Sequence, residues 1–376
     1  VVPFVNTNWE DIQRAKNSKK AKKRSEYPSR PLAQAIREYA PGNLLTLDNR
    51  VYESRGLMLN WKIPASDEQI KEIQAIGWLW RCSQCGASDR SAKKRTVCRE
   101  CQTSLLQHNI VRMLTPAGFA VRLGSDPHSN LVTKFGPPHE PPFLTAGDAA
   151  WSPLISPKLG RHRSTFRGTI NHMSSGVSGY GYAVCLDCGF AASEVDKTFK
   201  TMPRVLENHF PLRGGKRRID NQGICVGNKR SFAIQRGLRL GGQEITDIYQ
   251  LQLNHPGEGR PLNKIEATTV AVALRNALCA VLGIEQVEIG YTAQEDRFQS
   301  KVSGYSIYLY DTAAGGAGYA SQAAGMLPTL IRDARHVLEC SGLGCGDACH
   351  GCLLTFDTRY DVTNLDRHKG LEVLTD

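Results

Sequence analysis

Eleven of the twelve cysteines in this chain fall into three groups, and this pattern constrains the fold more than any other feature of the sequence. Grouped thiols are usually metal ligands or catalytic groups in a reducing compartment and disulfides in an oxidising one. No basic start followed by an apolar run and a small-residue cleavage site is visible, so we expect a reducing, cytoplasmic environment. The first residue is Val1 rather than Met, and we expect a trimmed chain or part of a longer polypeptide.

The first cluster consists of two CxxC pairs separated by twelve residues: Cys82, Cys85, Cys98 and Cys101. Each pair fits a tight turn that presents two thiolates to one ion, and two such turns complete a tetrahedron. This spacing predicts a zinc ribbon rather than incidental thiols or a redox pair. The segment between the pairs carries Lys93, Lys94 and Arg95, which could contact nucleic-acid phosphates or simply keep the surface soluble.

The second cluster is Cys185, Cys188 and Cys225, with a histidine needed to complete a structural site. We expect His209 to be the fourth ligand, with His172 as its competitor, although a single histidine is more often an ordinary core or surface residue. Gly189 follows the second cysteine and is expected to relax the tight backbone of the turn.

The third cluster places four thiols within thirteen residues: Cys340, Cys345, Cys349 and Cys352. A closed Cys₄ zinc site is the first choice, and an iron–sulfur cluster is the alternative because it also uses four thiolates. His350 lies inside this loop and is not expected to be a ligand. The remaining cysteine, Cys279, lies in an apolar helical stripe and is expected to be a small buried hydrophobic residue.

The chain is basic, with 47 Lys and Arg against 36 Asp and Glu, a formal net charge of +11. A basic surplus favours a polyanionic partner, most often nucleic acid. Three zinc sites with these thiolates would lower the charge to about +6, so the case depends on local patches. One patch is an N-terminal arm, either a solvated linker or a phosphate-contacting segment; its residues are Lys19, Lys20, Lys22, Lys23 and Arg24. The longest uncharged run, Thr312 to Ile331, is rich in glycine, so we expect no membrane span.

The pattern of apolar residues predicts helices and strands in mixed order, which indicates an α+β fold with several zinc-stabilised subdomains. Helices are expected at 32–39, after Ser66, at 266–282 and at 329–338; strands are expected at 246–253, 287–291 and 305–310, with a two-residue hairpin at Asp48–Asn49. We expect four regions: a basic linker or arm (1–30), a helix–hairpin region with the ribbon (31–115), a loop-rich region with the second site (116–240) and a C-terminal zinc-binding domain (241–376).

Motifs of the common catalytic classes are missing from the sequence. No GxxxxGK[ST] phosphate loop, no HExxH and no zinc-deaminase pattern occur. The turn Gly315–Gly318 follows a strand and is best read as a tight strand-to-helix crossover. Since all three metal sites have full ligand sets, no position is left for an activated water, and we expect no catalytic residue in this chain.

Residues 305–367 carry a specific resemblance, in the stretch Tyr308 to Tyr319 (YLYDTAAGGAGY), the third cysteine cluster and Asn364 to Arg367. This pattern resembles the MrfA-type zinc-binding domain at the C-terminus of superfamily 2 DNA helicases and their partners. Upstream segments at 31–42 and 50–56 extend the resemblance to bacterial anti-phage proteins of the Druantia (DruE) or DISARM (DrmB) kind. The four residues between Cys340 and Cys345 depart from the tighter pairs of MrfA.

The resemblance implies a zinc-binding, DNA-binding and scaffolding module of an ATP-dependent DNA helicase in anti-phage defence, with the ATPase motor outside this chain. In this interpretation the partners are DNA and a helicase motor, in the same polypeptide or in another subunit. The alternative is a motor-less helicase partner of the DrmB kind. A zinc-dependent hydrolase or nuclease is a third class, which the closed ligand sets disfavour.

Overall fold

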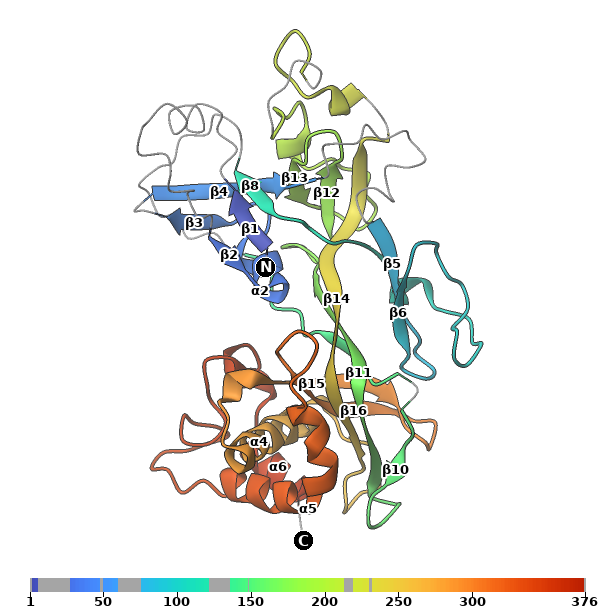
Figure 1. Ribbon diagram of the computed structural model, residues 1–376, viewed down its shortest axis with the longest axis vertical. Coiled ribbons are helices and arrows are strands. Elements are labelled where there is room, and N and C mark those ends of the chain that lie inside the picture. Colours follow the sequence, from blue (N-terminus) through green and yellow to red (C-terminus); the bar gives the residue numbers. More distant parts are fainter. Residues whose placement is uncertain are drawn as a thin grey trace.

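The computed structural model confirms the mixed α+β class. Figure 1 shows an elongated molecule with the N-terminal sheet and the second cysteine cluster at one end and the C-terminal helices at the other. The structure describes residues 2–5, 28–47, 50–59, 76–121, 136–147, 149–212, 219–229 and 232–374. The predicted basic arm (Lys19, Lys20, Lys22, Lys23 and Arg24) and the helix predicted after Ser66 lie outside the described residues.

A five-stranded sheet forms the N-terminal part, in the order β2-β1-β8-β4-β3. Leu47 of β3 pairs with Arg50 of β4, and the two predicted turn residues between them, Asp48 and Asn49, lie outside the described residues. Helix α2 confirms the predicted helix after Pro31 and buries Ala35 and Ile36 against this sheet. The bounds are β1 (Val2–Val5), β2 (Ser29–Arg30), α2 (Leu32–Glu38), β3 (Leu44–Leu47), β4 (Arg50–Leu57) and β8 (Phe119–Val121).

Two long antiparallel strands, β11 and β14, form the spine of a second, eleven-stranded sheet and run between the two ends of the molecule (Figure 1). The first half of β14 pairs with β12 and, in parallel, with β7, and its second half pairs with β16. The bounds are β5 (Ile76–Arg81), β6 (Ser88–Ser91), β7 (Ile110–Leu114), β9 (Phe143–Thr145), β10 (Ser152–Pro153), β11 (Gly160–Ser174), β12 (Tyr182–Cys185), β13 (Ala191–Ser193), β14 (Ile234–Leu253), β15 (Ile289–Arg297) and β16 (Ser303–Asp311).

The predicted strand 246–253 is the second half of β14, but it is not half-buried as its alternating pattern suggested. All eight residues are buried. One face, with Tyr249 and Leu251, packs in the core under helices α4 and α5, while Ile248 on the other face packs against Leu144 and Tyr308. Because the strand is covered on both sides, its polar residues are buried as well.

Helix α4 (Lys264–Leu282) confirms the predicted helix at 266–282 and lies in the core of the C-terminal half. Asn263 and Glu266 form a reciprocal capping box at its start, and Gly283 closes it in the left-handed conformation at φ 66°. By length and composition this helix alone, among the described residues, could cross a membrane, which the sequence-based expectation overlooked. However, 72% of its most apolar window is buried inside the protein, as in the core helix of a globular domain.

Helix α5 (Tyr319–Leu338) begins ten residues before the predicted start near Thr329 and contains Pro328 within it. Its first turn is fixed by Asp311 at the end of β16, whose carboxylate accepts hydrogen bonds from the backbone N–H groups of Ala317, Tyr319 and Ala320 (2.6, 3.1 and 2.8 Å). A carboxylate at a helix N-terminus accepts hydrogen bonds from otherwise unpaired backbone N–H groups and interacts favourably with the helix dipole. The glycine-rich turn is therefore the predicted strand-to-helix crossover.

Shorter elements complete the described chain: α6 (Arg367–Val373) and the 3₁₀ helices η1 (Gln107–Asn109), η2 (Arg204–Leu206), η3 (Val226–Lys229), η4 (Gln286–Glu288), η5 (Thr358–Tyr360) and η6 (Val362–Asn364). Strands β15 and β16 confirm the two strands predicted near 287–291 and 305–310, although β15 starts at Ile289 and continues to Arg297. The predicted boundary between residues 240 and 241 falls inside β14, and the division into four regions stays a prediction.

Candidate metal centres

The structure brings the eleven grouped cysteines and His209 together as three sets of four ligands. Within each set the ligand atoms all lie within 4.8 Å of one another. Four sulfurs placed tetrahedrally at ~2.3 Å from a zinc ion are ~3.8 Å apart, whereas a disulfide needs ~2.05 Å. Each set therefore fits one tetrahedral ion.

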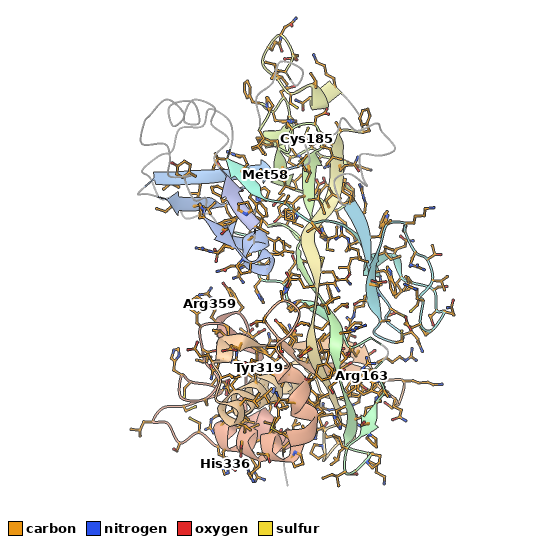
Figure 2. The ribbon with its side chains drawn as sticks, in the orientation of Figure 1. Met58, Arg163, Cys185, Tyr319, His336 and Arg359 are labelled. Carbon is orange, nitrogen blue, oxygen red and sulfur yellow. The ribbon has the colours of Figure 1, made fainter. Side chains whose placement is uncertain are left out.

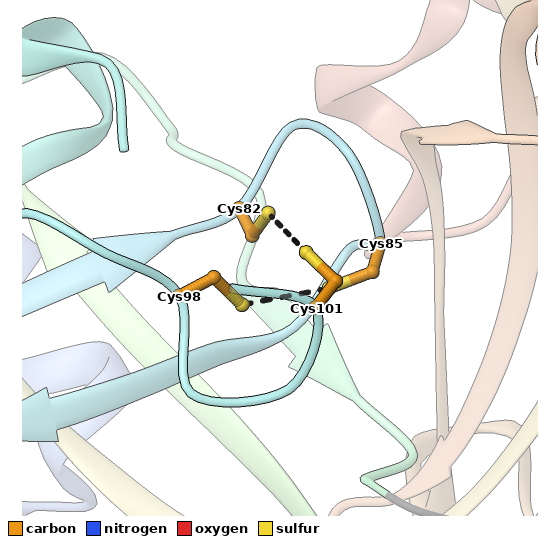
Figure 3. A group of neighbouring side chains, drawn as sticks. All are labelled: Cys82, Cys85, Cys98 and Cys101. Atoms are coloured by element: carbon orange, nitrogen blue, oxygen red, sulfur yellow. Dashed lines mark hydrogen bonds between the residues drawn. The ribbon is translucent and has the colours of Figure 1, made fainter. Parts of the chain in front are cut away.

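Two backbone turns hold the first cluster (Figure 3). The turn with Cys82 and Cys85 connects β5 to β6, and the turn with Cys98 and Cys101 follows β6. Sγ of Cys82 lies 3.5 Å from Sγ of Cys101, and Sγ of Cys85 lies 3.6 Å from Sγ of Cys98. Gly86 donates its N–H to the Cys82 carbonyl (2.9 Å) with φ 75°, which closes the first turn. These are the four residues that the CxxC spacing predicted.

The second cluster is buried under strands β12 and β13, near Cys185 in Figure 2. Cys185 ends β12, and Gly189 closes the turn after Cys188 at φ 87°, which confirms its predicted role. Cys225 comes from a distant segment, and its N–H donates to the carbonyl of His209 (3.0 Å). This hydrogen bond aligns the two later ligands, and Sγ of Cys185 lies 3.9 Å from Sγ of Cys225.

His209, and not its competitor His172, completes this cluster. Its Nε2 lies 3.3 Å from Sγ of Cys188, so Nε2 is the nitrogen that would bind the ion. Its Nδ1 faces the Leu206 carbonyl (2.9 Å) and Oδ1 of Asn228 (3.1 Å), and both are acceptors. A proton on Nδ1 leaves the Nε2 lone pair free for the metal, which is the tautomer that a ligand histidine needs. Sequence reasoning did not identify Asn228, because nothing in its spacing marks it.

The third cluster follows α5 directly and is partly exposed. Sγ of Cys340 and Cys349 are 3.7 Å apart, and Sγ of Cys345 and Cys352 are 3.9 Å apart. In an iron–sulfur cluster with four thiolates each sulfur binds a cluster iron rather than one shared ion, so these short separations give the iron–sulfur alternative no support. His350 points its Nδ1 at the Leu354 carbonyl (3.2 Å) and is not among the ligands, as expected.

Arg367 at the start of α6 holds the loop of the third cluster in place. Its Nε donates to the Gly346 carbonyl (2.9 Å), and its backbone N–H donates to the carbonyl of Asp347 (2.7 Å). The side chain thus ties a cysteine-rich loop with little core of its own to the end of the domain. The twelfth cysteine, Cys279, belongs to α4 and is buried in the core, as expected.

Thiols packed this closely without an ion cannot all ionise. In the second cluster, hydrogen bonding with Cys188 raises the pKa of Cys185, and the same kind of bond from Cys185 lowers the pKa of Cys225. One thiolate is thus stabilised by protonated neighbours. A divalent cation would favour the thiolate form of all three, which is the usual coupling between zinc binding and proton release.

The basic residues of the ribbon lie in the loop between β6 and the second CxxC pair. Lys93 is exposed and Arg95 is half-buried. Lys94 donates to Oε1 of Gln107 (2.8 Å), and its Nζ lies 5.6 Å from the ring centre of Trp78. The phosphate contacts expected of Lys93, Lys94 and Arg95 therefore stay a prediction.

Comparison with known proteins confirms the resemblance noted in the sequence. Residues 270–353 match the family model of the MrfA Zn-binding domain. The match begins inside α4, covers β15, β16 and α5, and ends directly after Cys352. It therefore includes the third cluster and excludes the first two.

The chain is also similar to the Druantia protein DruE of Escherichia coli (strain UMEA 4076-1), with 25% identity over 92% of the chain. That alignment spans 19% of DruE, so the chain corresponds to about a fifth of its relative. A solved structure described as DUF1998 helicase MrfA bound to DNA aligns with a TM-score of 0.36 and 11% identity, covering 70% of this chain and 28% of that one. A second, with DNA and AMPPNP, gives a TM-score of 0.23 and 10% identity, covering 37% and 24%. Both scores are too low to establish a shared fold.

Proposed function

We propose that this chain is a zinc-stabilised, DNA-binding and scaffolding module of an ATP-dependent DNA helicase in bacterial anti-phage defence. The observation that carries the proposal is the match of residues 270–353 to the MrfA Zn-binding domain, in a chain that is similar to DruE over most of its length. The ATPase motor lies outside these 376 residues, since they contain no phosphate-binding loop. The module acts in the cytoplasm, where its thiols stay reduced and available to zinc.

Zinc has a structural role in this proposal. Each cluster supplies four thiolate or imidazole ligands, which fill a tetrahedral ion and leave no position for a reacting water. When bound, the ion joins segments that are far apart in the sequence, such as Cys188 and Cys225. Structural zinc of this kind contributes directly to folding free energy. A zinc hydrolase or nuclease is disfavoured for the same reason.

A motor-less partner subunit of the DrmB kind remains the second candidate, because the missing ATPase motif fits it equally well. The similarity to about a fifth of the longer DruE chain favours a module that shares its polypeptide with the motor. The two candidates differ in how the motor depends on this module. A helicase polypeptide needs the module in cis, whereas a partner subunit can be added back in trans.

Binding of a fluorescein-labelled oligodeoxynucleotide, followed by fluorescence anisotropy, tests the DNA-binding part. We expect binding at about 50 mM salt that weakens steeply towards 200 mM, as phosphate contacts require. Absence of binding at low salt would remove the DNA-binding role and leave scaffolding alone.

A second experiment tests the role of the third cluster in the complete defence system. Replacing Cys340 and Cys345 with Ser should abolish phage protection without removing the motor.

A further inference from the structure

A pocket of about 240 Å³ lies where the first cysteine cluster meets the β11–β14 spine and the β15–β16 hairpin. Gln84 and Cys85 of the first zinc turn form one wall, and side chains of the three strands form the others. Arg163, one of these side chains, is labelled in Figure 2 on the opposite side of the C-terminal half from Arg359. The family match and the metal sites assign no role to this pocket.

Arginines on β11 dominate the floor of this pocket. Arg161 and Arg163 are two residues apart, so their side chains project from the same face of the strand. Each is paired across the ladder with a glutamine of β14, and each Nε donates to that glutamine's Oε1, at 2.8 Å for Gln252 and 2.7 Å for Gln250. A glutamine orients a guanidinium group without neutralising it, as a glutamate would do.

The pocket is lined by more cations than carboxylates. Arg297 and Lys301 of the β15–β16 hairpin add two more cations. Among the described residues, neither they nor Arg161 form an ion pair with a carboxylate. The acidic group of the pocket, Asp296, already pairs with Arg81 (2.8 Å) and accepts hydrogen bonds from Gln250 and Tyr308.

Trp151 gives the pocket a flat aromatic wall. The guanidinium carbons of Arg161 and Arg163 lie 4.1 and 4.4 Å from its ring centre. Both guanidinium groups thus lie against the same ring, and partial burial together with the charge of Arg163 lowers the pKa of Arg161. An anion bound in the pocket would reduce the repulsion between the two arginines.

Lys301 has a backbone conformation that also calls for an explanation. It adopts φ 63°, in the left-handed region that favours glycine, at the tight turn where its N–H donates to the Phe298 carbonyl (2.9 Å). A lysine at such a position costs free energy that glycine would avoid. Its charged side chain, which lines the pocket, is a reason for its presence there.

We propose that this pocket binds a backbone phosphate of a DNA strand. Arginine forks match phosphate oxygens in a bidentate manner, and the Nη groups of Arg161 form no hydrogen bond with the described residues. Gln84 and Cys85 of the first cluster form a wall of the site, so metal binding at the ribbon is linked to the affinity for the strand. The proposal rests on the DNA-binding function proposed above and assigns it to particular residues.

The test compares Arg161→Gln with Arg332→Gln, an equal loss of charge at an exposed position of α5, by the anisotropy of a fluorescein-labelled oligodeoxythymidine. Arg161→Gln should weaken binding by about tenfold or more and reduce the slope of log K against log salt by about 0.7. Arg332→Gln should leave the affinity of the protein close to that of the wild type. Equal metal content in all variants shows that the fold is intact.

Lys301→Gly separates binding from stability. Glycine removes the backbone strain, so this variant should unfold at the same or a higher temperature than the wild type while binding the strand more weakly. If it binds as tightly as the wild type, or if Arg161→Gln does, the pocket is not the phosphate site, although DNA binding elsewhere on the chain would stand. If the wild type binds no strand at low salt, both this inference and the proposed DNA binding fail. If pyrophosphate displaces the strand at concentrations below those at which the strand binds, the pocket serves free phosphates, and the inference is wrong.

Discussion

Asn228 should control how tightly the second cluster holds zinc, although it is not itself a ligand. The perturbation is Asn228→Leu, which keeps a similar side-chain volume and removes the acceptor 3.1 Å from Nδ1 of His209. Loss of a hydrogen-bond partner behind a metal ligand typically costs 10–100-fold in metal affinity. The Leu206 carbonyl still accepts from Nδ1 at 2.9 Å, so the lower end, about tenfold or about 1.4 kcal/mol, is expected.

The assay is competition for zinc with a chromophoric chelator, with the zinc content of the protein measured at each step. In the variant, one of three ions should be lost at about tenfold lower chelator concentration, and the other two should leave as they do from the wild type. Asn228→Asp is the matched control, because a carboxylate accepts the same hydrogen bond and should hold zinc at least as tightly as asparagine. Equal zinc retention in the Leu variant and the wild type would refute the reasoning, since His209 would then be oriented by Leu206 alone.

Further predictions concern metal content, a helix cap and acid stability. Elemental analysis should find three zinc ions and no iron per chain, and replacing Cys82 and Cys85 with Ser should remove one ion and unfold the ribbon, seen as protease cleavage near residue 90. Asn263→Ala should lower the free energy of unfolding by about 1 kcal/mol, because it removes the side chain that caps Glu266 at the start of α4, whereas Asn263→Gly should cost only a few tenths, as chemical denaturation can show. Burial, with a smaller contribution from a neighbouring histidine, lowers the pKa of His172 to about 4, so below pH 6.5 the unfolded chain takes up a proton that the folded chain refuses. The free energy of unfolding should therefore fall as the pH drops from 6.5 towards 4, by about 2 kcal/mol at pH 5. Chemical denaturation of His172→Gln should show a smaller fall in this free energy over the same pH range.

Local features of the sequence predicted the metal sites because a CxxC turn is a local structure. Two residues between the cysteines and a glycine after the pair are enough to place two sulfurs about one ion, as Gly86 and Gly189 show. The same holds for the end of α4 at Leu282, directly before Gly283, and for the antiparallel pairing of β3 with β4. His209 was a less direct inference, from the need of three thiols for a fourth ligand.

Contacts that the pattern of apolar residues does not encode decided what the sequence left open. Helix α5 starts at Tyr319 because Asp311 accepts its first N–H groups, and no local pattern near Thr329 carries that information. The second half of β14 is buried on both faces because separate segments cover each side, so its alternating polarity misled the sequence reasoning.

The sequence by itself determined the first and third ligand sets and the mixed fold class, because both depend on spacing within short stretches of the chain. In the second set it left His209 and His172 as alternatives, and the tertiary structure selected His209. Only the tertiary structure placed Asn228 behind His209 and brought Arg161 of β11 and Lys301 of the β15–β16 hairpin to the same pocket. Backbone hydrogen bonds of Cys225 with His209 and Asn228 bring the first two residues together. The pairing of β14 with β11 and β16 brings Arg161 and Lys301 to one pocket. Side chains of ordinary type become a site only where the strands align them.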